Sequence, residues 1–254
     1  MRKWFICVLP AMVLLTAACV DPYVLETKES YLSGEEGSYG FDSQTVLHAL
    51  AQGNTNIFTP EATTTGLPQP DVPPVQWSQA DFYRVAEAFH EFMWQDPMER
   101  WHLHRLAFTV ECEDAPFGPQ SVSLTLFRTL RIRQDRANTR FERYIYVEPR
   151  ANEISWIEAS YFPDIFSMSS VDPVQIRIPA EQALQIAESQ GGREARLAAE
   201  NNCTIFGSLV GGVRRDVGKS DWLIRYSGEG ESLPFEITID EQTGEYEVTY
   251  SKTK

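Results

Sequence analysis

The sequence has little positive charge, few cysteines and no hydrophobic run after its first 19 residues. It contains 22 Lys and Arg residues against 36 Asp and Glu, which gives a formal net charge of −14. This balance argues against binding to nucleic acid and against electrostatic attraction to anionic lipid. No later segment approaches the roughly 18 consecutive apolar residues that a membrane-spanning helix needs. We therefore expect no transmembrane helix after residue 19.

Motifs of several enzyme classes are also missing. There is no Gly-x-Ser-x-Gly nucleophile turn and no glycine-rich phosphate loop followed by Lys-Ser or Lys-Thr. His90-Glu91 begins like the HExxH zinc helix, but Trp94 occupies the position of the second histidine. The sequence therefore predicts a protein that is not an enzyme and that carries no catalytic residue, cofactor or metal.

A histidine pair leaves one alternative open. His102 and His104 are two residues apart, so on a strand they would share a face and could bind a metal with a third ligand. His90 and Glu111 are the candidates for that ligand, and a metal-dependent enzyme would follow. The other interpretation is a partly exposed histidine pair beside Trp101.

Residues 1–18 have the pattern of a secretory signal peptide. Arg2 and Lys3 supply the positive start, an apolar stretch follows, and small residues precede Cys19. The window 15–19, LTAAC, resembles the bacterial lipobox, whose cysteine is acylated and becomes the new N-terminus. The resemblance implies an extracytoplasmic protein of the cell envelope, anchored to a membrane through lipid on Cys19. An ordinary signal peptide is the alternative.

The remaining cysteines form a pair. Cys7 leaves with the signal peptide and Cys19 takes the lipid, which leaves Cys112 and Cys203. In an oxidising compartment an even pair predicts a disulfide. Two buried, unpaired thiols are the alternative.

Residues 19–76 are typical of a lipid-anchored N-terminus followed by a tether. One short helix is predicted over 42–53, and a stretch rich in proline and threonine then favours extended backbone that works as a spacer. The alternative is an irregular strap along the surface of the folded domain.

The folded part begins near Trp77 with a helix and four strands. Ser78 and Asp81 form an N-cap signature, and apolar residues then recur at helical spacing over 78–95. The period then changes to two, which indicates antiparallel strands with one buried face. The strand patterns cover 101–112, 122–132, 141–147 and 153–159.

The second half repeats this order. A helix starts at Pro179 and stops at Gly191-Gly192, a further helical turn is expected over 193–200, and four strand patterns follow. The last hairpins of the two halves align at an offset of 92, with Asn152 opposite Gly244, and both residues tolerate left-handed backbone. The sequence thus predicts an α+β fold of two tandem units, 77–162 and 172–254, each an antiparallel β-sheet packed on one helix. Chance similarity of two hairpins is the alternative.

The segment from Ile178 to Tyr250 resembles a PepSY domain. The matching parts are the helix IPAEQALQIAESQGG, the strand DWLIRYS and the hairpin FEITIDEQTGEYEVTY, whose turn runs from Asp240 to Glu245. The resemblance implies a PepSY-like or cystatin-like fold, an extracytoplasmic location and a non-catalytic role. Domains of this family are proposed to restrain or regulate peptidases, so a peptidase or another envelope protein is the expected partner.

An arginine-rich hairpin over 128–143 is the most unusual local feature of this acidic chain. Asp135 and Glu142 are the acidic residues within it. Such a surface could bind an anionic glycan, a lipid head group or an acidic partner, so a solute- or glycan-binding lipoprotein is the alternative function. Edge-strand protection and pairing with the domain's own carboxylates are the structural interpretations. The arginines are Arg128, Arg131, Arg133, Arg136, Arg140 and Arg143.

Overall fold

The computed structural model describes residues 30–54, 57–58, 76–130, 138–162, 168–211, 220–228 and 235–251. The predicted signal peptide and the lipid-accepting Cys19 lie outside these ranges, as does most of the proline- and threonine-rich stretch. Among the described helices, none has the length and apolar character needed to cross a membrane.

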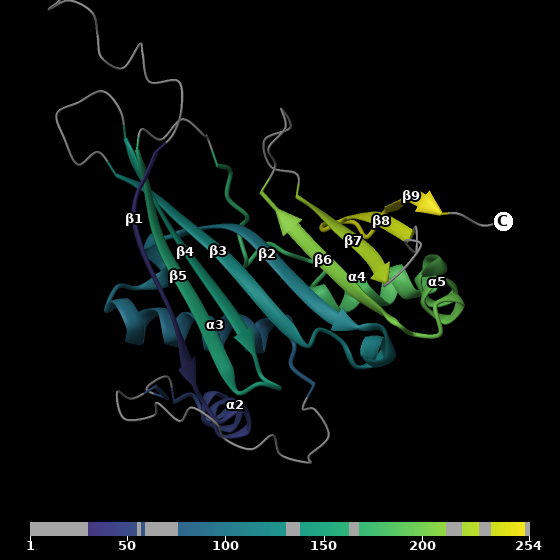
Figure 1. The fold of residues 1–254 in the computed structure, drawn as a ribbon, viewed down its shortest axis with the longest axis horizontal. Helices are drawn as coiled ribbons and strands as arrows, with labels where there is room; N and C mark the ends of the chain where they lie inside the picture. Colours follow the sequence, from purple (N-terminus) through teal and green to yellow (C-terminus); the bar gives the residue numbers. More distant parts are fainter. Residues whose placement is uncertain are drawn as a thin grey trace, which may run out of the picture.

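The described chain is built on one antiparallel sheet of nine strands (Figure 1). The strand order is β1-β5-β4-β3-β2-β6-β7-β8-β9, so the pair β2 and β6 lies near the middle and β1 and β9 form the edges. The strands are β1 (Ser30–Gly40), β2 (His102–Glu111), β3 (Ser121–Leu130), β4 (Thr139–Glu148), β5 (Glu153–Phe162), β6 (Cys203–Val210), β7 (Asp221–Gly228), β8 (Phe235–Asp240) and β9 (Tyr246–Ser251).

The α+β class and the predicted strands are confirmed. Each helix pattern is followed by four strands, and the strand patterns read from the sequence fall within two or three residues of the observed bounds. The turns of the two aligned hairpins place Asn152 at φ 53° and Gly244 at φ 74°. Left-handed backbone at both positions matches the expectation from the residue types.

The two halves do not form separate sheets, which differs from the predicted arrangement. Strand β2 pairs with β6 from Arg105 opposite Val210 to Glu111 opposite Thr204, so the sheet continues from one half into the other. This pairing covers the edge that each half would otherwise expose, and an unpaired edge is a liability for association. We call the junction between β2 and β6 the seam.

Helices cover one face of this sheet (Figure 1). The helix α3 (Gln79–Trp94) packs on β3 and β4, and α4 (Ala180–Ala187) packs on β7. The helix α2 (Ser43–Ala51) packs against α3. At Gly191, φ 118° produces a kink, after which the chain continues into α5 (Arg193–Ala198). The predicted stop at the glycine pair and the further helical turn are both present.

The start of α3 has the cap that the sequence predicts. The Ser78 side chain accepts a hydrogen bond from the Asp81 backbone, and the Asp81 side chain accepts one from the Ser78 backbone. The Trp77 ring lies 5.2 Å from the ring of Phe82, so it fixes the direction in which the chain enters the helix.

Part of the predicted tether belongs to the folded body instead. Strand β1 pairs with β5 along most of its length, and the predicted short helix is α2, capped by the side chain of Asp42. Phe41 and Phe58 are buried, and the Phe58 ring lies 5.5 Å from that of Phe89. Strand β1 is rich in Gly, Ser and Glu because an edge strand buries few side chains, and this composition resembles that of a spacer.

The predicted disulfide between Cys112 and Cys203 is present, with 5.2 Å between the Cα atoms. Cys112 follows the last residue of β2 and Cys203 is the first residue of β6. The disulfide therefore closes one end of the seam.

A glycine on β6 makes room for a large core side chain at the seam. Gly207 lies opposite Phe108 of β2, and a Cβ atom at this position would stand 2.1 Å from Cε1 of Phe108. We expect Gly207→Ala to lower the free energy of unfolding by about 1–3 kcal/mol, as overpacking typically does. Urea unfolding would measure the change. The double variant with Phe108→Leu should lose less than the sum of the two single variants, and strict additivity would contradict the proposed clash.

Candidate functional site

The helices α3 and α4 begin beside each other, and hydrogen bonds connect their first residues. The side-chain oxygen of Gln79 accepts a hydrogen bond from the Ala180 backbone N–H at 2.8 Å, which caps α4. The Glu181 carboxylate in turn accepts one from the Gln79 backbone N–H at 3.2 Å, which caps α3. Each helix therefore supplies an acceptor for an orphan donor of the other. This exchange holds the halves at a fixed distance.

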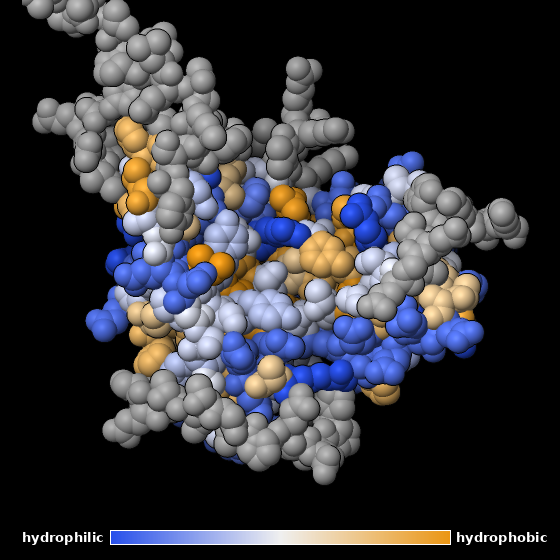
Figure 2. Space-filling view, in the orientation of Figure 1, coloured by the Kyte–Doolittle hydropathy of each residue, from blue (hydrophilic) through white to orange (hydrophobic). Residues whose placement is uncertain are grey.

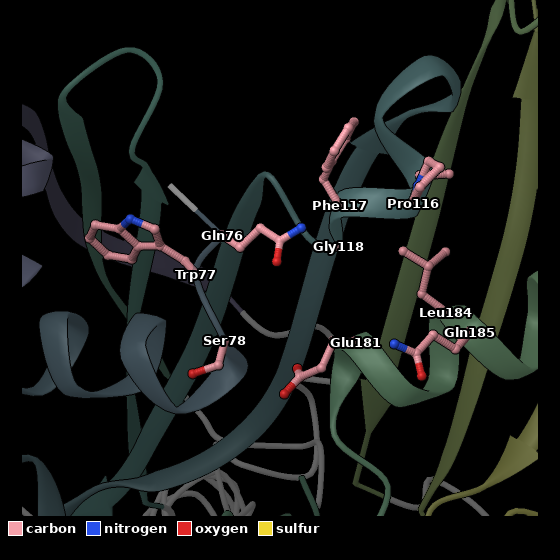
Figure 3. A pocket seen from close by; sticks show the side chains of 10 residues that line it. Gln76, Trp77, Ser78, Pro116, Phe117, Gly118, Glu181, Leu184 and Gln185 are labelled. Atoms are coloured by element: carbon pink, nitrogen blue, oxygen red, sulfur yellow. The ribbon is translucent and has the colours of Figure 1, made fainter. Parts of the chain in front are cut away.

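A cleft opens where these helix starts meet the turn after β2 (Figure 3). Its volume is about 250 Å³, and we call it the seam cleft. In Figure 3, Pro116 and Leu184 face each other on one side, and the Glu181 carboxylate is directed toward the start of α3. The lining residues are Gln76, Trp77, Ser78, Ala115, Pro116, Phe117, Gly118, Glu181, Leu184 and Gln185.

Phe117 borders the seam cleft with its side chain in solvent. It is 54% exposed and belongs to the 3₁₀ helix Cys112–Phe117, directly after the disulfide cysteine. The disulfide and the pairing of β2 and β6 fix the base of this turn. A rigidly held, exposed phenylalanine beside a cleft is the arrangement of an anchor in a protein interface.

One acidic side chain, that of Glu181, lines the seam cleft. Glu111 is the exposed last residue of β2, and Glu113 is exposed on the turn that follows, but neither lines the cleft. Asp114, on the same turn, forms an ion pair with Arg150 at 2.9 Å. The Glu181 carboxylate therefore favours a cationic group on whatever enters the cleft.

A second polar constellation lies buried under the far end of α3. The Arg143 guanidinium is sandwiched between two indoles, 4.0 Å from the ring centre of Trp101 and 4.4 Å from that of Trp94. Its Nη1 donates to Nε2 of His90 at 3.0 Å, and its Nε donates to Glu158 at 3.0 Å. We call these residues, with Asp96, the Arg143 cluster. Such desolvated cation–π contacts with two charge-assisted bonds hold the arginine firmly.

Asp96 joins the Arg143 cluster to the surface. Its carboxylate accepts a hydrogen bond from the Trp101 indole N–H at 2.8 Å and lies 3.6 Å from both Arg143 and Arg128. The hydrogen bond from Trp101, together with the charges of the neighbouring arginines, holds the pKa of Asp96 below its usual value. Asp96 therefore stays ionised and balances part of the positive charge.

The described arginines of the hairpin do not form one surface. Arg128 and Arg143 both approach Asp96 on the helix side of the sheet, and Arg143 is buried. Arg140 is buried on the opposite face, where its Nε donates to Glu142 at 2.6 Å. Arg131, Arg133 and Arg136 lie outside the described residues. Arg140 and Arg143 lie on opposite faces of the sheet because side chains alternate along β4. Each described arginine of the hairpin pairs with carboxylates of the domain itself.

The face of the sheet away from the helices is partly open (Figure 2). Pale and orange residues gather over its middle strands in Figure 2, between blue, hydrophilic ones. Arg105 stacks on Phe206 with 5.3 Å between the guanidinium carbon and the ring centre, and its Nε donates to Ser208 at 3.0 Å. Tyr144 donates to Glu142, and burial with this hydrogen bond raises the pKa of Tyr144. These side chains satisfy one another, so we place no site on this face.

The histidines do not come together. His102 and His104 contact the ring of Phe127 at 5.3 and 6.1 Å, and His104 also hydrogen-bonds the Ser169 carbonyl. His90 is a buried residue of α3 and belongs to the Arg143 cluster. In the parts of the chain that the structure describes, no group of three His, Cys, Asp or Glu side chains could hold a metal ion. The alternative metal site at His90, His102 and His104 is therefore wrong.

Comparisons with known proteins add little. No protein-family model matches the sequence, and no curated protein matches it significantly. Among solved structures, the chain is similar to a MaoC-like dehydratase from Phytophthora capsici, with 10% identity, 89% of this chain and 96% of that chain covered, and a TM-score of 0.17. A score this low carries no argument about fold or function. The resemblances to the lipobox and to PepSY domains stay predictions.

Proposed function

We propose that this protein is a non-catalytic, lipid-anchored protein of the cell envelope that binds and regulates another envelope protein, with a peptidase as the preferred partner class. The observation that carries this proposal is exposed Phe117 beside the seam cleft. Exposed aromatic residues that border a cleft are candidates for binding hot spots. The signal-peptide pattern and the disulfide both support an oxidising, extracytoplasmic compartment.

The charge around the seam cleft narrows the partner. The Glu181 carboxylate in the cleft and the net charge of −14 both favour a partner that presents a basic segment. The cleft is large enough for one side chain, and its apolar wall of Pro116 and Leu184 suits an aliphatic stem. A lysine or arginine of the partner, with its stem on this wall and its charge at Glu181, would satisfy both.

The internal symmetry supports the same proposal. The two halves, each a helix followed by four strands, are two copies of one α+β unit that meet at the seam, and the second copy is PepSY-like. Two left-handed hairpin turns in matching places, at Asn152 and Gly244, support the duplication. A cleft at such a junction is lined by residues of both copies, and ligand sites occur preferentially at such interfaces.

The proposal predicts that Phe117→Ser weakens binding of the partner about 10- to 100-fold, the usual effect of losing an interface anchor. The full chain would be used to isolate partners from solubilised envelope, and the affinity of the purified partner for both forms would then be measured. Val174→Ser is the matched control, because Val174 is 90% exposed and follows the segment bridged to Leu103, at the other end of β2. Its affinity should be unchanged.

Three outcomes contradict the proposal: equal affinities for both variants, partners that are all cytoplasmic, or recovery of a glycan or small solute in place of a protein. The last outcome would favour the alternative, a solute- or glycan-binding lipoprotein that uses the arginine-rich hairpin 128–143. Arg128 is the described arginine with which to test that alternative, because 35% of its side chain is exposed.

A further inference from the structure

His90 is held in one protonation state by its two neighbours. Its Nδ1 lies 2.8 Å from the backbone oxygen of Asp96, and its Nε2 lies 3.0 Å from Nη1 of Arg143. A carbonyl oxygen accepts hydrogen bonds and a guanidinium donates them, so the proton of neutral His90 is on Nδ1 and Nε2 is the acceptor. A second proton, on Nε2, would point at the N–H of Arg143.

The surroundings of His90 offer little compensation for a second charge. His90 is fully buried, and the rings of Trp94 and Trp101 lie 5.0 and 5.8 Å from its own. The carboxylates that face the Arg143 cluster, Asp96 and Glu158, are already paired with arginines. An imidazolium would therefore add an uncompensated charge to a buried site.

The charged groups around His90 come from every element packed against it. Strand β4 supplies Arg143 and β5 supplies Glu158. The loop after α3 supplies Asp96, to which Arg100 and Arg128 are paired at 3.4 and 3.6 Å. Glu87 lies three residues before His90 on α3, and burial and then the charge of Glu99 raise the pKa of Glu87. The three arginines already exceed the two carboxylates by one charge while His90 is neutral, and protonation of His90 would raise this excess to two.

The end of α3 depends on this neutral state. Asp96 and Trp101 belong to the segment that follows the helix, and their contacts with His90 and Arg143 fasten that segment to the sheet. The helix itself stops at Gln95, whose φ of 49° is left-handed and unfavourable for a residue other than glycine. Loss of the bond between His90 and Arg143, with repulsion in its place, would remove one of the contacts that hold the last turn to the sheet.

We propose that the Arg143 cluster is an acid-responsive latch: protonation of His90 separates it from Arg143 and releases the end of α3, with Trp94 and Trp101, from the sheet. The proposal is independent of the partner-binding function. An extracytoplasmic protein meets the pH of its surroundings, so such a latch would let external acid change the exposed surface. The class of device is a histidine-gated opening.

The sign and size of the effect follow from the protonation states. Burial, with the Arg143 charge, lowers the pKa of His90 from 6.5 to about 4 in the closed form. In an open form the imidazole would regain its ordinary pKa, so the open form binds more protons between these values. Acid therefore favours opening, about 10-fold per pH unit and about 300-fold in total between pH 6.5 and 4. Above pH 6.5 the closed form keeps its full advantage.

Hydrogen–deuterium exchange on the full chain tests the proposal. After correction for intrinsic exchange, protection of the amides near residues 90–96 should fall about 10-fold per pH unit below pH 6.5, while protection in β2 and β6 stays constant. Trp fluorescence should shift over the same range. His90→Gln keeps an acceptor for Arg143 but cannot titrate, so its protection should not change with pH.

Two comparisons separate His90 from other groups that titrate in this range. His102→Gln is the matched control at an exposed histidine and should keep the wild-type response. A fall in protection in His90→Gln equal to that of the wild type would overturn the proposal and assign the response to carboxylates such as Glu87. If His90→Gln fails to fold, NMR titration of wild-type His90 decides: a pKa well below 6.5 supports the latch, and a pKa of 6 to 7 in the folded state refutes it.

Discussion

Replacing Arg143 with methionine should lower the free energy of unfolding by about 3–5 kcal/mol, the usual cost of breaking a buried ion pair by removing one partner. The guanidinium donates to His90 and Glu158 and fills the space between two indoles. Methionine fills part of this space but donates nothing, so the acceptor atoms of both partners lose their bonds. Urea unfolding followed by circular dichroism would measure the loss.

The sheet contains a matched control for this prediction. Arg225 on β7 forms an ion pair with Glu236 at 2.6 Å, but 58% of its side chain is exposed. Arg225→Met should therefore cost less than about 1 kcal/mol, as exposed pairs do. The two variants make the same chemical change in the same antiparallel sheet, so the difference between them measures burial. Equal losses would contradict the structural role that we assign to the Arg143 cluster.

The comparison also explains why the sequence leaves a surface of hairpin arginines open as one of two interpretations. In a sequence, arginine is expected at the exterior because it is rarely buried without a partner. The partners of Arg143 come from α3, from the loop after it and from β5, and the sequence separates them from Arg143 by 53 residues at His90, 47 at Asp96 and 15 at Glu158. No local pattern connects them. The helical pattern predicted over 78–95 stops just before Asp96, and this boundary identifies only the end of α3.

The regular elements could be predicted because their signals are local. The capping box at Ser78, the helical period of α3 and the alternation of the strands depend on residues a few positions apart. Strand β1 could not be recognised in the same way, because its partner β5 lies more than 100 residues later and its sequence is polar. The pairing of β2 with β6 could not be predicted either, because no local pattern shows which strands will form the edges of each half and pair there.

The candidate site was missed for a related reason. Phe117 and Glu181 are 64 positions apart and meet only because the seam brings the turn after β2 to the start of α4. The segment 114–119, DAPFGP, predicts only an exposed turn, and nothing in it indicates that Phe117 borders a cleft. The disulfide was the one long-range contact that the sequence did predict, because the two cysteines were all that the other assignments left.

Replacing both Cys112 and Cys203 with alanine should lower the free energy of unfolding by about 4–5 kcal/mol, because the disulfide closes a loop between residues that are 91 positions apart. On the chain-entropy model, most of this effect comes from the greater freedom of the unfolded chain. A reducing agent should destabilise the wild-type protein by a similar amount and leave the double variant unchanged. A loss below about 1 kcal/mol would contradict this account.

The shape of the unfolding curve tests the continuous sheet as well. Strands β2 and β6 are hydrogen-bonded on both sides, to β3 and to β7 as well as to each other, so the seam persists without the disulfide. The exchange of caps between Gln79 and Glu181 also remains. We therefore expect the double variant to unfold in one cooperative transition at a lower denaturant concentration. Two separate transitions would show that the halves unfold independently and that the disulfide, rather than the seam, joins them.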